Sequence, residues 1–321
     1  MSTGAQAVVD AGGAELTRIM DRVERRMSEL AAGHGPVLAR HAGDTISAGG
    51  KRLRPMLVCL AAGAPPPETD GLVRAAVAVE LVHGATLVHD DVLDGSALRR
   101  GRPTVVATAG RAAATATGDL LFSRAFAELA CGGSADSVRV LARASRELAL
   151  GELTQREDAY RLDVSVARYE ARCRLKTGVL FRAACELGAL EADGDPDALG
   201  AFGERIGLAF QMLDDVLDVS GPPERTGKPR GADLLDGTVT LPLILAQAVD
   251  PSLSGLDLRA VRSAADAARL CDVIAATGAL DGARRRAQEL VADAKLGLPA
   301  LPLRQREALA LAADVMVKRY A

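Results

Sequence analysis

The stretch LVRAAVAVELVHGATLVHDDVLD, residues 72–94, decides the fold of this chain. It is long, rich in alanine and valine, and closed by three aspartates. Apolar residues recur along it at helical spacing, which is typical of a helix that packs in a protein core. We therefore expect a buried helix that carries a cluster of carboxylates at its C-terminal end.

The last five residues of this stretch, DDVLD at 90–94, recur at 214–218, again at the end of an apolar helical run. Residues four apart lie on one face of a helix, one turn from each other. The first and last aspartates of each copy should therefore point the same way. Like charges at this spacing repel each other, and their place at a helix C-terminus opposes the helix dipole.

A bound cation would offset both of these penalties. Oxygen ligands without histidine or cysteine suit Mg²⁺, which commonly binds one or two carboxylates together with substrate phosphates. Two facing clusters could hold several ions on one diphosphate. The simpler interpretation, solvated acidic helix ends, suits a single DDxxD better than two identical copies accompanied by basic residues.

Basic residues follow glycines in GGKRLRP at 49–55 and surround one in LRRGRPT at 98–104. Glycine allows close backbone approach, and arginine offers a forked donor to phosphate oxygens. Lys176 and Lys228 lie beside glycine or other small residues, and His83 lies two helical turns before the first aspartate cluster, on the same face. Taken alone, a run of cations is typical of a solvated surface, and a lone histidine is more often a core residue.

The composition favours an all-α protein. Hydrophobic residues make up 49% of the 321 residues, aromatics only 2%, and there is no tryptophan, so alanine, leucine and valine must build the core. Alanine and leucine favour helix, and no convincing alternating strand is present. We expect one helical catalytic domain at 15–321 after a flexible N-terminus at 1–14, with the proline- and glycine-rich segment 220–237 as a lid.

Charge and cysteine usage restrict the class of protein further. The net charge of −3 argues against a protein that coats nucleic acid. Five scattered cysteines without a CxxC pair predict neither a disulfide framework nor a zinc site, which fits a reducing cytoplasm. No secretory signal is visible in residues 1–16. The sequence contains no run of about eighteen apolar residues, so we expect no transmembrane segment.

Together these motifs make the chain similar to the trans-isoprenyl diphosphate synthases, the polyprenyl synthetase family, from about Glu15 to Tyr320. The resemblance rests on GGKRLRP at 49–55, HGATLVHDDVLDGSALRRGRPT at 83–104, Gly118-Asp119, Gly151-Glu152, Gln155, Lys176-Thr177, FQMLDDVLD at 210–218, Gly227-Lys228-Pro229 and Thr240-Leu241-Pro242. It implies a single large helical bundle with a central active-site cavity, and a homodimer. It also implies Mg²⁺-dependent head-to-tail (1'-4) condensation of isopentenyl diphosphate with an allylic diphosphate.

The resemblance implies a role for each matching side chain. Direct magnesium ligands are expected at Asp90, Asp94 and Asp214. Ligands that act directly or through water are expected at Asp91, Asp215 and Asp218, with three ions once substrate is bound. The allylic diphosphate is expected to bind Arg99, Lys176 and Lys228. Isopentenyl diphosphate is expected to bind Lys51, Arg54, His83 and Arg100. The developing cation is expected beside Thr177 and Gln211.

The length of the product should depend on the helix below the first aspartate cluster. Val79 and Thr86 share the face of its first aspartate, and Ala85 lies five residues before that aspartate. In the family, bulky aromatics at the positions of Ala85 and Thr86 close the product tunnel early. Both residues are small here, and the helix from Val79 to Thr86 spans roughly 10 Å, room for about two further isoprene units. We therefore expect a medium- or long-chain all-trans product, with Phe122 and Phe126 either as a tunnel floor or as ordinary core aromatics.

Three other functions stay open on the sequence. A geranylgeranyl diphosphate synthase would make a shorter product by the same chemistry. A class I terpene cyclase also ionises a diphosphate at a DDxxD cluster, but it does not need GGKRLRP, and its second metal site usually has an asparagine, serine and glutamate pattern. A non-catalytic subunit of a heteromeric synthase tends to lose carboxylates, and all six are present here.

Overall fold

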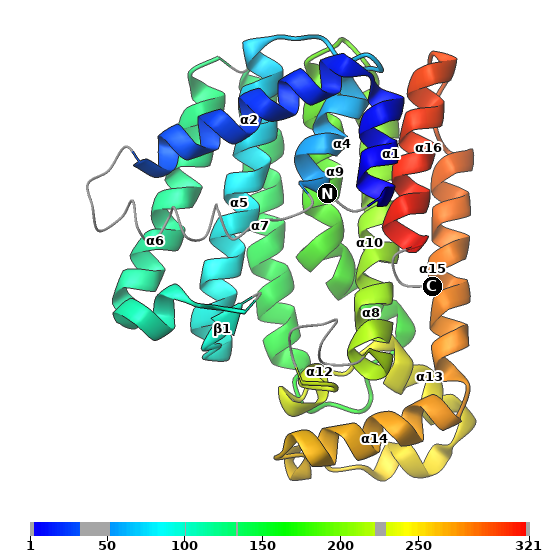
Figure 1. The fold of residues 1–321 in the computed structure, drawn as a ribbon. Coiled ribbons are helices and arrows are strands. Elements are labelled where there is room, and N and C mark those ends of the chain that lie inside the picture. The colour runs from blue at the N-terminus through cyan, green and yellow to red at the C-terminus, as the bar shows by residue number, and fades with distance from the viewer. Residues whose placement is uncertain (1–2, 33–51, 100, 133, 222–228, 319–321) are drawn as a thin grey trace. The chain divides into compact units, whose positions relative to one another are not determined.

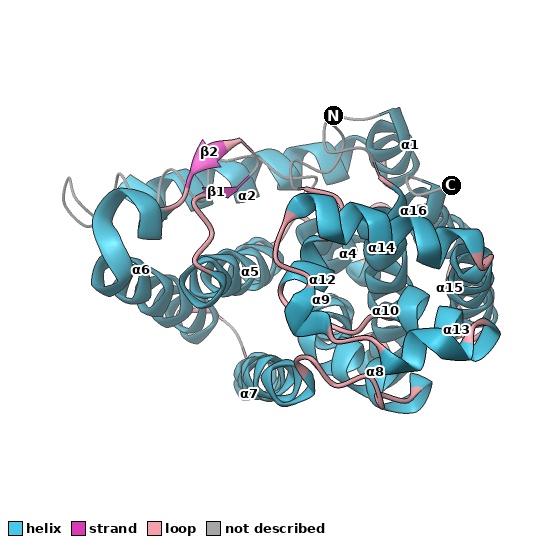
Figure 2. Cartoon of the chain, turned by 90° about the horizontal axis from the view of Figure 1, so that it is seen from below, coloured by secondary structure: helices cyan, strands magenta, loops and turns pink. Residues whose placement is uncertain are grey.

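The computed structural model describes residues 3–32, 52–99, 101–132, 134–221 and 229–318. Within these ranges the chain is helical apart from turns, loops and one small hairpin, which confirms the predicted all-α class (Figures 1 and 2). The chain divides into two compact units, and the boundary falls inside α7 (Ala135–Asp158) and α10 (Pro196–Ser220).

Unit 1 comprises Met1–Ser145, Leu180–Gly203 and Gly297–Val315. Its helices are α1 (Thr3–Gly12), α2 (Ala14–Ala32), α4 (Leu53–Ala62), α5 (Asp70–Asp94), α6 (Val105–Ala130), most of α9 (Val179–Leu190) and most of α16 (Leu303–Lys318). Within this unit α5 contacts α2, α4 and α6. The first DDVLD motif therefore ends the helix that unit 1 is packed around.

Unit 2 comprises Arg146–Val179, Glu204–Leu296 and Met316–Ala321. Its elements are α8 (Val166–Cys173), the π-helical turn η1 (Arg174–Gly178), α12 (Ala232–Leu235), α13 (Leu241–Val249), the 3₁₀ helices η2 (Pro251–Gly255) and η3 (Leu258–Ala260), α14 (Ala264–Ala276) and α15 (Ala279–Leu296). In this unit α13 contacts α8, α14 and α15. The second DDVLD motif lies in unit 2, near the end of α10.

The alanine- and valine-rich stretch forms α5, and local chemistry defines both ends of this helix. The hydroxyl of Thr69 caps the N-terminus by accepting the backbone N–H of Leu72 at 3.1 Å. Gly95 ends the helix in the left-handed conformation, with φ of 63°. Glycine adopts this conformation without steric penalty, so the helix stops directly after Asp94. The buried helix with a terminal carboxylate cluster is therefore confirmed.

A small hairpin follows α5. β1 (Leu98–Arg99) pairs antiparallel with β2 (Arg102–Pro103). The hydroxyl of Thr104 donates to the carbonyl of Ser96 at 2.6 Å and accepts the N–H of Ala107, so one side chain closes the hairpin and caps α6. A strand of two residues is too short to show an alternating pattern of apolar and polar side chains, so the sequence did not predict this hairpin.

Two segments differ from what the sequence predicted. Residues 3–12, expected to be flexible, form α1, because Val8 and Val9 are buried and the helix packs on α2. Within 220–237, expected to be one long loop, residues 232–235 form α12. The part of that segment at 222–228 lies outside the described residues.

Helix α5 is long and apolar enough, by length and composition alone, to cross a membrane. The sequence showed no such segment, because the stretch is interrupted by charged residues. Two thirds of the most apolar part of the helix, 67%, is buried inside the protein. The composition of α5 is therefore accounted for by its place in the core of unit 1.

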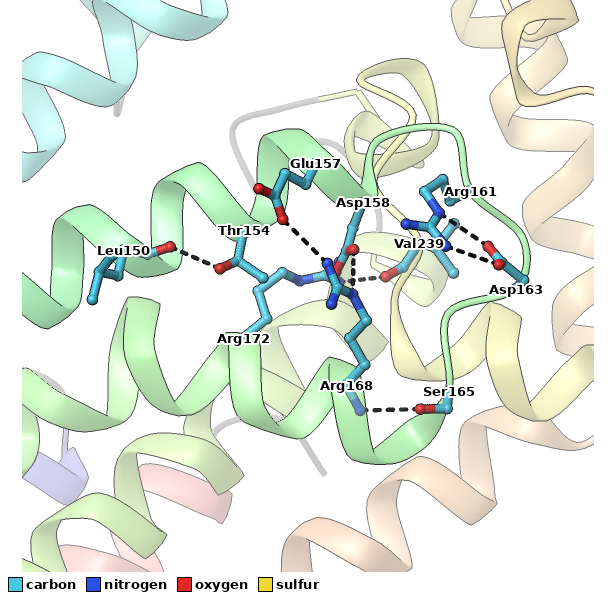
Figure 3. Close-up of polar contacts among 10 residues, drawn as sticks. All are labelled: Leu150, Thr154, Glu157, Asp158, Arg161, Asp163, Ser165, Arg168, Arg172 and Val239. Atoms are coloured by element: carbon cyan, nitrogen blue, oxygen red, sulfur yellow. Dashed lines mark hydrogen bonds and ion pairs between the residues drawn. The ribbon is translucent and has the colours of Figure 1, made fainter.

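A buried ion-pair cluster joins several segments of unit 2 (Figure 3). Asp158, at the end of α7, has no exposed side-chain surface and accepts from Arg168 at 2.5 Å and from Arg172 at 3.2 Å, both on α8. Arg172 also donates to the carbonyl of Val239 at 2.5 Å. Because a buried carboxylate is stable only with such partners, the cluster fixes the segment after α12 against α8.

Gly95 offers a test of how α5 ends. Gly95→Ala should lower the free energy of unfolding by about 1 kcal/mol, because a Cβ is strained in the left-handed conformation. No neighbouring atom lies within 4 Å of that Cβ, so strain is the only cost. Gly255→Ala is the matched control, since it also has open space but no positive φ. Urea unfolding that shows equal stability for both variants would contradict this account.

Candidate functional site

The first aspartate cluster lies at the C-terminal end of α5, in unit 1. Asp90 is half-buried and Asp94 is exposed. Asp91, in contrast, is only 5% exposed, and its Oδ1 accepts from Nε of Arg99 at 2.8 Å and from Nη2 of the same side chain at 2.7 Å. The hairpin after α5 thus brings Arg99, an expected diphosphate ligand, onto the second aspartate of the motif.

The other basic residues of unit 1 have different surroundings. The guanidinium of Arg54 lies 4.5 Å from the ring centroid of Phe181, a cation–π contact that fixes one face of the side chain. His83 is half-buried on α5. Three predicted ligands of the diphosphates lie outside the described residues, namely Lys51, Arg100 and Lys228.

Arg52 anchors the described end of the GGKRLRP segment, a role that the sequence did not predict. Its backbone is left-handed, with φ of 48°. Its side chain bonds Glu24 of α2 at 2.5 Å and Glu80 of α5 at 2.8 Å. The start of α4, which carries Arg54, is therefore tied to both neighbouring helices.

The second aspartate cluster lies near the C-terminal end of α10, in unit 2. Asp214 is half-buried, whereas Asp215 is only 3% exposed. One oxygen of Asp215 accepts from the hydroxyl of Tyr169 at 2.6 Å, and the other accepts from the amide nitrogen of Gln211 at 2.8 Å. The amide oxygen of Gln211 accepts the hydroxyl of Thr177 at 2.7 Å. The two residues expected beside the cation are therefore connected to the second aspartate of this motif.

Asp218, the last aspartate of the second cluster, binds the backbone that follows it. Its two oxygens accept the N–H groups of Ala232 at 3.1 Å and Asp233 at 3.3 Å, at the start of α12. Burial and, after it, the nearby carboxylate of Asp233 raise the pKa of Asp218 to about 8 and the pKa of Asp215 to about 7. A bound cation beside these carboxylates would stabilise their ionised form.

Lys176 lies in the π-helical turn η1, a kind of turn that is frequent at functional sites. Its Nζ donates to Oε2 of Glu152 on α7 at 2.7 Å. Burial opposes ionisation of Glu152, but the charge of Lys176 and the hydrogen bond from Arg156 outweigh it, so the pKa of Glu152 is lowered. A Cβ at Gly151 would lie 2.6 Å from the backbone nitrogen of Lys176, so glycine allows α7 to approach η1 this closely.

The two copies of DDVLD share one pattern of burial. In each copy the first aspartate is half-buried, the second aspartate and the valine are buried, and the last aspartate keeps exposed surface. Successive residues on a helix are rotated by about 100°, so the second carboxylate points into the protein while the first and last share another face. The sequence predicted that shared face, and the structure adds a protein partner for each second carboxylate.

The donor set fits a magnesium site that substrate completes. Among the described residues, no three aspartate, glutamate, histidine or cysteine side chains converge into a metal site made by protein alone. Mg²⁺ keeps several waters and usually takes one or two carboxylates plus substrate phosphates, rather than a cage of protein ligands. The first and last aspartates of each copy offer such a partial set.

The three residues expected to set the product length lie on α5 and differ in exposure. Val79 and Ala85 have no exposed surface. Thr86 is half-buried, and its hydroxyl donates to the carbonyl three residues earlier at 2.8 Å. Phe122 of α6 stacks on His89 with ring centroids 5.8 Å apart, so it belongs to the packing between α5 and α6. Of the three, Thr86 therefore has the most room for a larger side chain.

The sequence did not predict three side chains that act on the predicted site residues of unit 2. Glu152 lies in a segment that carries the family resemblance, and that segment could have drawn attention to it. Asp233 lies 15 residues after its partner Asp218, inside the segment expected to be a loop. Tyr169 lies 46 residues before Asp215, and no local pattern distinguishes it from any other tyrosine on an amphipathic helix.

The raised pKa values of Asp215 and Asp218 predict how the metal-free protein responds to pH. Both carboxyls hold their protons more tightly in the folded protein than in the unfolded chain, where the ordinary value is 3.8. Their contribution to the free energy of unfolding should therefore stay constant below about pH 4 and fall as the pH rises toward 8. Melting temperatures in a chelating buffer, compared between acidic pH and pH 8, measure this fall.

The matched variants for this test are Asp218→Asn and Asp293→Asn. An asparagine side chain does not titrate, so the first variant should lose less stability between the two pH values. Asp293 is exposed on α15 and serves as the control, which should follow the wild-type protein. If the melting temperature falls equally in the wild-type protein and in both variants, the raised pKa of Asp218 is contradicted.

Residues 36–271 of the chain match the family model described as Polyprenyl synthetase. The chain is 39% identical to heptaprenyl diphosphate synthase component 2 of Geobacillus stearothermophilus over 275 residues, which cover 84% of each protein. It is 35% identical to octaprenyl diphosphate synthase of Escherichia coli K12 over 282 residues, which cover 85% of this chain and 87% of the relative.

A solved structure of a polyprenyl synthase from Caulobacter crescentus, complexed with calcium and isoprenyl diphosphate, is similar to this fold. The two structures have a TM-score of 0.90 at 37% sequence identity. The match covers 99% of this chain and 98% of that one. The similarity therefore extends over the whole chain and is not confined to the motifs.

Proposed function

Since the chain belongs to the polyprenyl synthetase family and is therefore a prenyltransferase, we propose that it condenses isopentenyl diphosphate head-to-tail (1'-4) with an allylic diphosphate. The observation that carries the proposal is the shared burial pattern of the two DDVLD motifs. In each copy the second carboxylate is buried on protein donors, whereas the first and last keep more exposed surface. Such paired carboxylates suit a metal–diphosphate complex.

The outer aspartates would hold the metal. We assign direct Mg²⁺ ligation to Asp90, Asp94 and Asp214, and an indirect role through water to Asp218, whose oxygens also hold the start of α12. Asp91 and Asp215, which the resemblance also implies as ligands, would instead act on the metal only through the protein groups that they hold. Three ions with substrate bound is the number that the family resemblance implies. Bound Mg²⁺ supplies the charge neutralisation that makes a diphosphate a better leaving group.

Two of the side chains proposed to bind the allylic diphosphate are held by carboxylates of the protein. Arg99 is held by Asp91, and Lys176 is held by Glu152. A side chain that is fixed before binding loses less conformational entropy when it contacts a phosphate. Lys228 would complete this set. The corresponding set for isopentenyl diphosphate is Lys51, Arg54, His83 and Arg100.

The chemistry needs no nucleophile from the protein. Departure of the diphosphate leaves an allylic cation, which the double bond of isopentenyl diphosphate attacks, and the departing diphosphate takes the proton that is lost. The hydroxyl of Thr177 and the amide of Gln211 would place oxygen dipoles beside this cation. Their hydrogen bond of 2.7 Å supports a joint role.

We propose a medium- or long-chain product. Relatives that make heptaprenyl and octaprenyl diphosphates support this length, and so does the small side chain of Thr86. Geranylgeranyl diphosphate is the alternative product, which other relatives make according to their names.

We further propose a homodimer in the cytoplasm. Free thiols support a reducing compartment, since all five cysteines are free and four of them are buried. The name of one relative, heptaprenyl diphosphate synthase component 2, keeps a heteromeric assembly as the alternative. Size-exclusion chromatography with light scattering on the purified chain distinguishes a dimer from a monomer that awaits a partner.

Turnover by the purified protein tests the proposed function. Isopentenyl diphosphate, an allylic primer and Mg²⁺ should give linear polyprenols longer than geranylgeraniol after dephosphorylation, as measured by mass spectrometry. Chelation of the metal should abolish the reaction. Asp90→Asn should lower kcat by about 100-fold or more, whereas Asp293→Asn should retain it.

Each other product would contradict part of this proposal. A cyclised hydrocarbon would indicate a terpene cyclase, and geranylgeraniol alone would indicate the shorter synthase. Absence of turnover until a second polypeptide is added would indicate the subunit of a heteromeric enzyme.

The depth of the product tunnel can be tested at Thr86. An aromatic ring at Ala85 would overpack a fully buried position, so Thr86→Phe is the safer variant. It should shorten the product while the first condensation continues. Thr108→Phe is the matched control, because Thr108 is also a helical threonine whose hydroxyl bonds a backbone carbonyl. An unchanged product from Thr86→Phe would refute the predicted role in chain length.

A further inference from the structure

Four side chains of unit 2 form one continuous chain of hydrogen bonds. Tyr169 on α8 donates to Asp215 at 2.6 Å, Gln211 donates to the other oxygen of Asp215 at 2.8 Å, and Thr177 of η1 donates to Gln211 at 2.7 Å. Tyr169 has no exposed surface, and Asp215 and Thr177 are also buried. The hydrogen bond between Tyr169 and Asp215 is therefore enclosed by protein.

The direction of each hydrogen bond in this chain follows from the chemistry of its members. The phenol of Tyr169 donates to one oxygen of Asp215, and the NH₂ side of the Gln211 amide donates to the other. The oxygen side of that amide then faces Thr177 and accepts the proton of its hydroxyl. Thr177 has one such proton, so its oxygen offers only lone pairs to any other group.

The direction of these hydrogen bonds leaves lone pairs on the Thr177 oxygen, which suits a reaction that forms a cation. The same direction depends on Tyr169. We propose that Tyr169 is a positioning residue that holds Asp215 in the orientation from which the Gln211 amide and the Thr177 hydroxyl are aligned, so that Thr177 presents an electron-rich oxygen to the allylic cation. The inference rests on the proposed function, because a different reaction would need a different polarity at Thr177. Without the phenol, one oxygen of a buried carboxylate loses its donor, and the side chain can turn away from Gln211.

Removal of the hydroxyl alone should leave the packing intact. The ring of Tyr169 is fully buried, and the guanidinium of Arg172 lies 5.7 Å from its centroid. Phenylalanine keeps these ring contacts, so Tyr169→Phe isolates the hydrogen bond. Tyr160→Phe is the matched control, since Tyr160 also lies in unit 2 beside an arginine, Arg259, at 4.7 Å.

A double-mutant cycle with Thr177→Val separates positioning from general stabilisation. Tyr169→Phe should lower kcat by roughly tenfold and leave KM for both diphosphates within about twofold of wild type, because the affected dipoles act on the cation. In the Thr177→Val background, Tyr169→Phe should lower kcat by less than about twofold, because the hydroxyl that Tyr169 is proposed to align is already absent. Tyr160→Phe should change kcat in neither background.

Equal losses of kcat in the two backgrounds, or a rise in KM with kcat intact, would overturn the inference. If Tyr169→Phe does not fold, as circular dichroism would reveal, Asp215→Leu removes both acceptor oxygens, including the one that binds the Tyr169 hydroxyl, and must show the same dependence on Thr177. A wild-type protein without prenyltransferase turnover would instead refute the proposed function, so the two failures are distinguishable.

Discussion

Each DDVLD motif buries its second carboxylate, and a buried carboxylate is stable only when the protein supplies a counter-charge or donors. Asp91 obtains the guanidinium of Arg99, and Asp215 obtains the phenol of Tyr169 and the amide of Gln211. The rotation between successive helical residues then leaves the first and last carboxylates on a different face. Both copies therefore bury the second carboxylate on protein donors by the same local geometry.

In each unit, the chain that follows the motif returns to contact it. In unit 1, the left-handed Gly95 stops α5 and the hairpin returns Arg99 to it. In unit 2, Asp218 holds the start of α12, and the buried Asp158 cluster fixes the segment that follows (Figure 3). The groups proposed to bind diphosphate are thus held by side chains that do not themselves need to touch substrate.

The sequence alone predicted the features that depend on regular spacing along a helix. The buried helix at 72–94, its terminal carboxylates and the shared face of the outer aspartates follow from spacing alone. The helix α1 was missed, because the packing of Val8 and Val9 on a neighbouring helix is not visible in a segment rich in glycine and alanine. Tyr169 and Glu152 were missed because their partners are 46 and 24 residues away, and no local pattern predicts such a contact.

We propose that Asp90, Asp94 and Asp214 bind metal directly, whereas Asp91 and Asp215 hold protein groups. Binding of Mn²⁺, as a spectroscopic substitute for Mg²⁺, can be counted by electron paramagnetic resonance in the presence of inorganic diphosphate. Asp90→Asn should lose at least one bound ion, whereas Asp91→Asn should keep the wild-type number and instead weaken the hold on Arg99. Equal loss of ions in the two variants, or loss only in Asp91→Asn, would contradict the account.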